Sequence, residues 1–270
     1  MILMHSIFLY IIILLITVIL FLFLKKTVFE EFNKKSALCL LTVKPNNIHI
    51  EFFNKFDKYD VYVFVDNNSI NINEFKIKYP NIHFIQFPDE KVIEEGYWES
   101  SYVIPKKTIS WDKALYYFSK INTTYIYVWF IEDDVYIPTQ ESLILLDKYS
   151  NDLICNKFIS NFDGKEGWHW GQAEPYFELP WAGGLQCICR LSNRLLNKIK
   201  EFVDKHKKLT FIEVLFTTLV IQNNYSYICP DEFVEIDCCK THKISDLDPN
   251  ILYHPIKNIE DHKILRQKIT

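Results

Sequence analysis

Arginine is scarce in this sequence: only Arg190, Arg194 and Arg266 occur among the 30 basic residues. Arginine makes the bidentate contacts by which proteins read phosphates and guanine, so its scarcity argues against a surface that reads nucleic acid. The net charge of -4 also leaves no positive surplus for non-specific binding to nucleic acid. We therefore expect no nucleic-acid partner.

The sequence also lacks the short motifs of several metal and redox proteins. Its seven cysteines contain no Cys-x-x-Cys pair, which excludes a zinc ribbon and a thioredoxin-like motif. No internal repeat and no linker rich in proline and glycine divides the chain. The composition, 49% hydrophobic and 24% charged, is that of a globular protein. We expect one domain of catalytic size, residues 36–270.

One long apolar run is present, from Ile7 to Leu24. It is long enough to cross the hydrocarbon layer of a bilayer, roughly 30 Å thick. Lys25 and Lys26 follow it where a secretory signal would have small residues for cleavage. The pattern predicts an uncleaved, single-pass membrane anchor at 7–24, preceded by a short segment at 1–6 and followed by a charged stalk at 25–35.

The side of the membrane on which the domain lies is left open by the sequence. The lysines that follow the anchor favour the cytosolic side, because positively charged flanks stay in the cytosol. The Asn-x-Ser/Thr sequons at 67–69, 122–124 and 224–226 point to the opposite side. Such short motifs also arise by chance, so they carry little weight.

Apolar runs alternate with helical patterns after the stalk, which predicts an open, mainly parallel α/β sheet flanked by helices. Strands are expected at 37–43, 61–65, 82–87, 125–131 and 185–190. Helices are expected at 111–119, with Ser110 as the N-cap, and at 141–149, 191–205 and 210–222. Residues 231–270 are expected to be irregular. Ligands of such sheets bind beyond the carboxyl ends of the strands.

Two of the predicted strands run into acids at that edge. Asp66 follows the strand at 61–65, and the triplet Glu132-Asp133-Asp134 follows the strand at 125–131. Adjacent carboxylates repel one another, and a divalent cation such as Mg²⁺ or Mn²⁺ would relieve that repulsion. The alternatives are a solvated acidic turn for the triplet and a simple Asp-Asn-Asn loop signal for Asp66.

At this point the residues resemble a known family. The stretch Tyr127–Pro138 resembles the DXD region of GT-A glycosyltransferases, in the EDD form of N-acetylglucosaminyltransferase I. Other short segments are similar to glycosyltransferase-like proteins of large DNA viruses and algae: Ser110–Leu115, Arg190–Ser192, Phe211–Glu213 and His254–Lys257. The resemblance covers residues 37–260 and implies a GT-A-like fold, here behind one transmembrane helix, with a viral or algal relationship.

The resemblance implies a membrane-anchored glycosyltransferase that uses a nucleotide-sugar donor, a UDP-sugar above all, with Mn²⁺ or Mg²⁺. It implies Asp134 and His254 as metal ligands. The donor would be contacted by Asp66, Trp111, Lys113, Glu132, Asp133 and Lys257. The acceptor, a glycan, protein or lipid, is not indicated, and neither is retention or inversion at the sugar.

Glu213 is the candidate catalytic base, because in inverting members of this fold a carboxylate takes the proton of the acceptor hydroxyl. It lies in an otherwise apolar helical segment, although a place on the solvent face of that helix is the alternative. The long aromatic loop before the strand expected at 185–190 holds Trp168, Trp170 and Trp181. Their rings predict a wall or lid for a sugar acceptor, with ordinary packing as the alternative.

Two other functions stay open. A metal-dependent phosphoesterase or nuclease could use the same acids, but it needs further converging ligands, and the chain has no His-Asp or His-x-His pair. A glycan-binding protein of the same fold would need no turnover. The intact triplet at 132–134 disfavours this third function.

Overall fold

A computed structural model of the chain describes residues 36–104 and 108–269. These residues belong to one compact unit, Ser36–Thr270. The predicted membrane anchor at 7–24 and the stalk at 25–35 lie outside the described residues. Among the helices within the described ranges, none combines the length and the apolar character that a membrane crossing requires.

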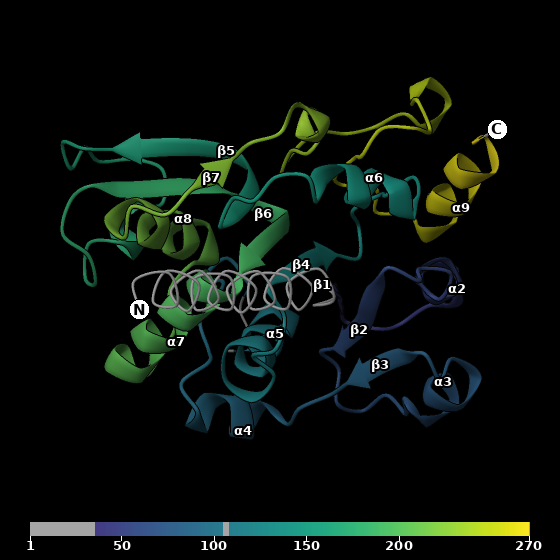
Figure 1. The fold of residues 1–270 in the computed structure, drawn as a ribbon, viewed down its shortest axis with the longest axis horizontal. Coiled ribbons are helices and arrows are strands. Elements are labelled where there is room, and N and C mark those ends of the chain that lie inside the picture. The colour runs from purple at the N-terminus through teal and green to yellow at the C-terminus, as the bar shows by residue number, and fades with distance from the viewer. Residues whose placement is uncertain (1–35, 105–107, 270) are drawn as a thin grey trace, which may run out of the picture. The chain divides into compact units, whose positions relative to one another are not determined.

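The described residues build a seven-stranded mixed sheet with the order β3-β2-β1-β4-β6-β5-β7 (Figure 1). The strands are β1 (Ser36–Thr42), β2 (Tyr59–Val65), β3 (Ile82–Ile85), β4 (Tyr127–Glu132), β5 (Leu153–Asn161), β6 (Trp181–Ser192) and β7 (Tyr227–Ile228). Strands β3, β2, β1 and β4 are parallel neighbours. Strand β6 runs antiparallel to both β4 and β5, and β7 is parallel to β5. The predicted α/β class with a mainly parallel sheet is confirmed.

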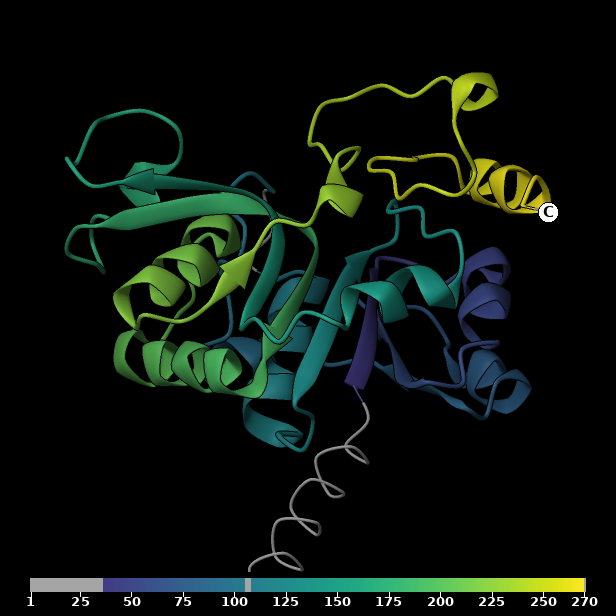
Figure 2. The same cartoon turned by 45° about the horizontal axis from the view of Figure 1, so that its top comes forward.

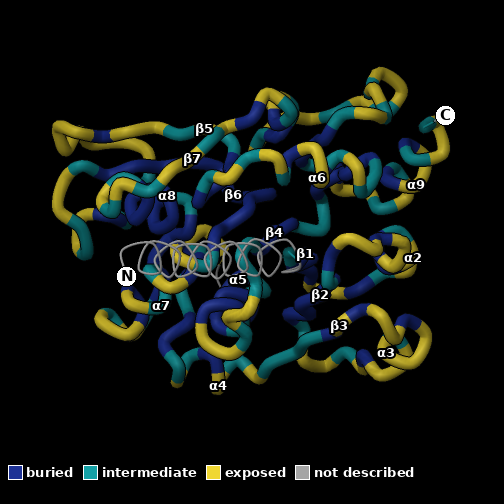
Figure 3. Tube along the Cα trace, viewed as in Figure 1, coloured by how far each residue is buried: buried dark blue, intermediate teal, exposed yellow. Residues whose placement is uncertain are grey.

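The parallel strands are apolar along their whole length because helices cover both faces of the sheet. In β1, Ala37, Cys39 and Leu41 pack into one hydrophobic cluster, whereas Leu38 and Leu40 pack into a second cluster on the other face. Figure 3 shows this burial as the dark blue of the central strands. The four parallel strands and β6 confirm the strands that their apolar runs predict.

Two layers of helices enclose the sheet. The first cluster is covered by α4 (Asp89–Glu94), α5 (Ser110–Tyr116) with its π-helical continuation (Tyr117–Ile121), α7 (Asn193–His206) and α8 (Ile212–Gln222). The second is covered by α2 (Asn47–Phe53), α3 (Asn73–Lys78) and α6 (Gln140–Leu146). Figure 2 shows the green helices α7 and α8 side by side, and they are in contact. Short 3₁₀ turns lie at Trp170–Gln172, Asp231–Phe233 and Ile244–Asp246.

Strand β5 has no counterpart among the strands expected from the sequence. Its register with β6 shifts between Ile154 and Asn156 and again between Asn156 and Ile159. Such bulges interrupt the alternation of apolar and polar residues by which a half-buried strand is recognised. The sequence pattern therefore does not predict β5.

Two further expectations need correction. Ser110 is not the N-cap of α5 but its first residue, and the Asp112 carboxylate receives the backbone N–H groups of Ile109 at 2.7 Å and of Ser100 at 2.9 Å. The end of the chain is also not entirely irregular, since it contains α9 (Ile259–Gln267), whose first turn is capped by the Asn258 side chain. Helix α9 is held by packing on α2, which the local sequence does not reveal.

Candidate active site

The carboxyl ends of β1, β2 and β4 meet at one edge of the sheet because these strands are parallel neighbours. A cavity of about 910 Å³ lies at this edge. Six residues predicted from the sequence line it: Asp66, Trp111, Glu132, Asp133, Asp134 and Lys257. Thr42, Asn67, Asn68, Ser69 and Asp89 also line it and were not among the predicted site residues. The acidic triplet therefore lines a cavity rather than a flat surface.

Each acid of the triplet has its own partners. Trp111 donates its indole N–H to Glu132 Oε1 at 2.8 Å. Thr42 donates its hydroxyl to Asp133 Oδ2 at 2.5 Å. The carbonyl oxygen of Asp134 accepts the backbone N–H of Ile256 at 2.7 Å. Side chains and backbone from distant parts of the chain thus fix the turn that carries the acids.

The three carboxyl groups differ in their pKa. Burial, with the nearby charge of Asp134, raises the pKa of Glu132 to about 7 although the Trp111 hydrogen bond opposes the shift. Burial also raises the pKa of Asp133, against the bond from Thr42. Burial acts in the same direction on Asp134, but the hydrogen bond and charge of His254 and the charge of Lys257 outweigh it and lower that pKa. Asp134 is the acid that stays ionised most readily.

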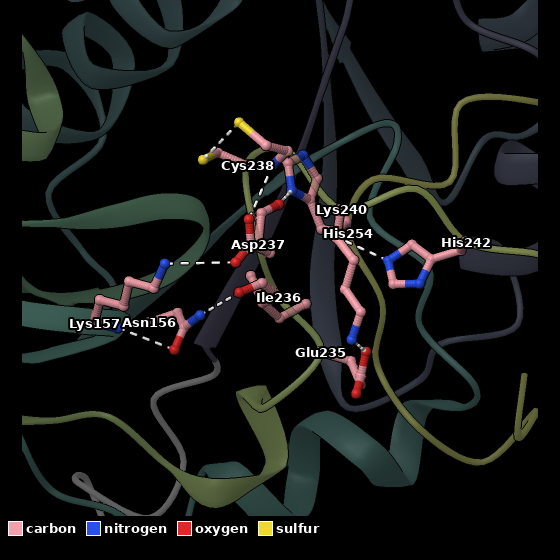
Figure 4. Close-up of polar contacts among 10 residues, drawn as sticks. Asn156, Lys157, Glu235, Ile236, Asp237, Cys238, Lys240, His242 and His254 are labelled. Atoms are coloured by element: carbon pink, nitrogen blue, oxygen red, sulfur yellow. Dashed lines mark hydrogen bonds and ion pairs between the residues drawn. The ribbon is translucent and has the colours of Figure 1, made fainter.

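His254 is brought to the triplet from the C-terminal part of the chain. Its Nε2 lies 3.2 Å from Asp134 Oδ1 and 3.7 Å from Glu132 Oε2. Its Nδ1 donates to the carbonyl oxygen of Asp237 at 2.5 Å (Figure 4). Lys257, three residues further on, places its Nζ 3.5 Å from Asp134 Oδ2 and is exposed to solvent. The predicted grouping of Asp134 with His254 is found in the structure.

The segment that contacts His254 is itself tied to β5. Asn156 donates its side-chain N–H to the carbonyl oxygen of Ile236, and Lys157 Nζ lies 3.5 Å from Asp237 Oδ2 (Figure 4). The backbone N–H of Asp237 also donates to the His254 carbonyl oxygen at 3.2 Å. Strand β5 therefore helps to hold the segment that positions the His254 imidazole.

A cysteine that the sequence analysis did not select also faces the acids. The donor atoms of Glu132, Cys187 and His254 all lie within 4.8 Å of one another, and this is the one such group of three donors among the described residues. Burial raises the pKa of the Cys187 thiol, and the charges of Glu132, Glu213 and Asp134 add to the shift. The signal for Cys187 is its place on β6 next to Ile188, which pairs with Ile131 beside Glu132, and this place appears only once the strand pairing is known.

Lys113 lies beneath the cavity and is not among its lining residues. Its side chain is 1% exposed, and its Nζ lies 3.0 Å from Asp66 Oδ1 and 2.8 Å from Asp89 Oδ1. It also donates to the carbonyl oxygen of Asp66 at 2.7 Å. Lys113 was expected to contact a donor, whereas in the structure it positions two carboxylates of the cavity wall.

Glu213 lies in the first turn of α8, partly buried, and does not line the cavity. Burial raises its pKa to about 7, the charge of Glu132 adds to the shift, and the charges of His254 and Lys157 oppose it. Helix α8 packs on β6, so Glu213 lies on the β6 side of the sheet. A carboxyl group with this pKa can accept a proton near neutral pH.

The aromatic residues expected to form an acceptor wall divide into two groups. Trp170 and Trp181 are buried in a small cluster with Phe211, so they have a packing role. Trp168 is 40% exposed, and its ring covers Gly183, where a Cβ would lie 1.9 Å from the ring. Tyr102, which is hydrogen bonded to His169, is also exposed.

No protein-family model matches this chain, and no curated protein matches it. Among solved structures, the galactosyltransferase LgtC in complex with donor and acceptor sugar analogues is 12% identical, with 87% of this chain and 96% of that chain covered and a TM-score of 0.48. Mouse xyloside xylosyltransferase 1 is 11% identical, with 83% of this chain and 98% of that chain covered and a TM-score of 0.41. The 4-diphosphocytidyl-2C-methyl-D-erythritol synthase of Anaerococcus prevotii is 9% identical, with 87% and 95% covered and a TM-score of 0.44. Each of these TM-scores is below 0.5.

Proposed function

We propose that this protein is a divalent-cation-dependent glycosyltransferase that moves a sugar from a nucleotide-sugar donor to an acceptor hydroxyl. The observation that carries the proposal is the convergence of Glu132, Asp134 and His254 beside a cavity of about 910 Å³ at the carboxyl edge of parallel strands. Open α/β sheets bind their ligands at this edge. Pockets for small ligands have volumes of about 300–1,000 Å³, so a nucleotide-sugar fits the space available.

The end of β2 supports the nucleoside part of this proposal. Asp66, Asn67, Asn68 and Ser69 line the cavity with carboxylate, amide and hydroxyl groups. Such groups bind the hydroxyls of a ribose and the polar edge of a base by hydrogen bonds. Asp66 is held in place by Lys113, so it needs no rearrangement to accept a hydrogen bond.

The residues present fit a divalent cation, either Mn²⁺ or Mg²⁺ by the family resemblance. Asp134, whose pKa is lowered, and the Nε2 atom of His254 are the proposed ligands. When bound, such a cation supplies Lewis-acid stabilisation of the departing nucleoside diphosphate. Lys257 lies on the same side of the cavity with an exposed amine, which would contact a diphosphate oxygen.

Glu213 is the proposed base for the acceptor. Its pKa of about 7 lets the carboxylate take the proton of the attacking hydroxyl group near neutral pH. Tyr102, Trp168 and His169 form an aromatic surface near it, since the charge of Glu213 contributes, after burial, to the raised pKa of Tyr102. Aromatic rings pack on the apolar faces of sugars, so this surface supports a glycan acceptor.

A two-metal phosphoesterase or nuclease is less well supported. Such an enzyme needs a second set of ligands about 3.5–4 Å from the first metal. Within the described residues a single group of three His, Cys, Asp or Glu donors is found. No observation favours this function over sugar transfer.

The test is a screen of nucleotide-sugars with the full chain, with and without added Mn²⁺. We expect release of nucleoside diphosphate from one donor class only when the cation is present. Thermal stabilisation by the same donor should likewise require the cation, because a ligand that binds only the folded state raises its stability. Release of phosphate from a diester, with no response to any nucleotide-sugar, would contradict the proposal.

Membrane anchoring through residues 7–24 belongs to the same proposal. Expression of the full chain in a eukaryotic cell tests both the anchor and its orientation. We expect the protein to resist extraction from membranes at alkaline pH. Glycosylation at Asn67, Asn122 or Asn224, detected as a mobility change on deglycosylation, would place the domain on the non-cytosolic side.

A further inference from the structure

Cys187 lies beside Glu132, where the ladder between β4 and β6 ends. The last residue pair in the antiparallel register of β4 and β6 is Ile131 and Ile188, and Glu132 and Cys187 are the residues next to this pair at the end of the ladder. The sheet therefore holds a thiol beside a carboxylate, independently of any flexible loop.

His254 completes a group of three different donors. The carboxylate oxygen of Glu132, the sulfur of Cys187 and a ring nitrogen of His254 all lie within 4.8 Å of one another. In a four-coordinate zinc site, with bonds of about 2.0–2.3 Å, neighbouring donor atoms lie about 3.3–3.8 Å apart. Small side-chain movements of the three residues, which lie on three separate segments, would bring them to that spacing.

The imidazole is already oriented for ligation. Its Nδ1–H group donates to the Asp237 carbonyl oxygen at 2.5 Å, which directs Nε2 toward the acids. A histidine that binds a metal usually donates its second ring N–H in this way. His254 is 6% exposed and Cys187 is 8% exposed, so water competes little for the position between them.

We propose that Cys187 supplies a sulfur ligand to the cation of this site, with Glu132 as a further ligand beside Asp134 and His254, so that the site prefers Zn²⁺ or Co²⁺ to the Mg²⁺ that the family resemblance implies. This inference rests on the proposed function because that function places a cation beside the acids. It adds that the cation is of the zinc-like class. Thiolate ligands select zinc-like metals, whereas Mg²⁺ takes oxygen ligands and keeps several of its waters. On binding, the S–H bond breaks, a sulfur–metal bond forms, and the proton passes to the solvent.

Cobalt absorption tests the proposal directly, because a cobalt–thiolate bond gives a near-ultraviolet charge-transfer band that nitrogen and oxygen ligands do not give. The experiment uses a full-length variant with the substitutions Cys229→Ser, Cys238→Ser and Cys239→Ser, which remove the exposed thiols of the described residues. We expect one equivalent of Co²⁺ to produce the band. Absence of the band at saturating Co²⁺ overturns the proposal without any variant at position 187.

Cys187→Ser in the same background should lose the band and bind Co²⁺ at least about tenfold more weakly. Cys189→Ser is the matched control: Cys189 is fully buried two residues along the same strand and outside the three-donor group, so its variant should keep the band. A band retained in Cys187→Ser overturns the proposal. Circular dichroism checks that each variant is folded.

Competition measures the metal preference. Zn²⁺ should displace Co²⁺ at an equivalent concentration, and a large excess of Mg²⁺ should leave the band unchanged. Displacement by Mg²⁺ overturns the proposal. If the band is present but no nucleotide-sugar is hydrolysed, the proposed function is wrong and the thiolate ligand is supported. If hydrolysis depends on a cation but the band is absent, the thiolate ligand is wrong and the proposed function is supported.

Discussion

The indole N–H of Trp111 donates to Glu132 Oε1 at 2.8 Å, while the ring stacks on Phe130 with centroids 5.4 Å apart. One side chain therefore links α5 to the end of β4 and holds the first acid of the triplet. The hydrogen bond favours the ionised form of Glu132, against the burial that raises its pKa to about 7. The helix thus influences both the position and the charge of this carboxylate.

Replacing Trp111 by phenylalanine should keep the stacking on Phe130 and remove the hydrogen bond. The pKa of Glu132 should then rise, because a bond to the charged form is lost. At a fixed Co²⁺ concentration, the Trp111→Phe variant should therefore need a higher pH than the wild type before half of its cation sites are occupied. Co²⁺ absorption across a pH series measures this occupancy. Trp98→Phe removes an indole bond to the Lys207 carbonyl oxygen instead and should leave the pH dependence unchanged.

Asp134→Ala should remove cation-dependent donor binding and leave the fold intact. Asp134 contacts both His254 and Lys257 through its carboxylate, and its backbone contact with Ile256 does not need the side chain. We expect at least a tenfold loss of donor affinity in a thermal-shift titration with Mn²⁺ present. Asp163→Ala, a change at an exposed acid, is the control; unchanged affinity in Asp134→Ala would count against the assigned site.

Glu213→Gln should slow sugar transfer by about 10²–10⁴-fold, the usual contribution of a general base. Donor binding should persist, since Glu213 does not line the cavity. The wild-type rate should rise with pH through about 7 as Glu213 ionises, and the variant should lose that rise. Glu260→Gln changes an acid in the first turn of another helix and should have wild-type kinetics.

Lys113→Met should destabilise the fold by about 3 kcal/mol, because it removes the buried cation that contacts the buried Asp66 carboxylate and the partly buried Asp89 carboxylate. The Lys113 and Asp66 side chains are 1% and 7% exposed. Urea unfolding measures the change. Lys257→Met is the matched control at an exposed lysine, which should alter stability by less than about 0.5 kcal/mol and weaken donor binding instead.

The cation-free protein should lose stability as the pH rises from about 6.5 to about 8. Burial raises the pKa of Glu132, Glu213 and Asp112 to about 7 in the folded state, above their ordinary values. The folded state therefore binds more protons than the unfolded state over this range, and unfolding becomes easier as they leave. Urea midpoints measured across the range test this, and an increase with pH would contradict it. Asp152, with a pKa lowered to about 2, and the buried His49 and His262, with pKa values lowered to about 3 and about 4, act in the opposite direction only below about pH 6.5.

The sequence predicts the β1, β2 and β4 strands and their acids well, because a strand covered on both faces is a continuous apolar run and the charged residues after it are conspicuous. It does not predict Cys187 as a neighbour of Glu132. That neighbourhood depends on the reversal of β6 beside β4, which no local pattern encodes. The expected metal preference changes for the same reason, since the acids alone suggest Mg²⁺ or Mn²⁺.

Lys113 shows the same limit for charged residues. A lysine in an amphipathic helix is ordinarily read as solvated or ligand-facing, and its burial here depends on Asp66 and Asp89, which come from two other segments. The aromatic loop was predicted as one surface, but Phe211 packs on Trp170 and Trp181 and removes them from it. In both cases the decisive partner is distant in sequence.

His254 follows every strand of the sheet in chain order, since the last strand, β7, ends at Ile228. A polypeptide interrupted after residue 250 would contain the complete sheet and the acidic triplet but neither the imidazole nor the amine of Lys257 that face Asp134. During synthesis, the proposed cation site would form only after the segment that carries His254 and Lys257 has emerged and folded back. The nascent protein would thus lack the proposed activity until that segment is in place.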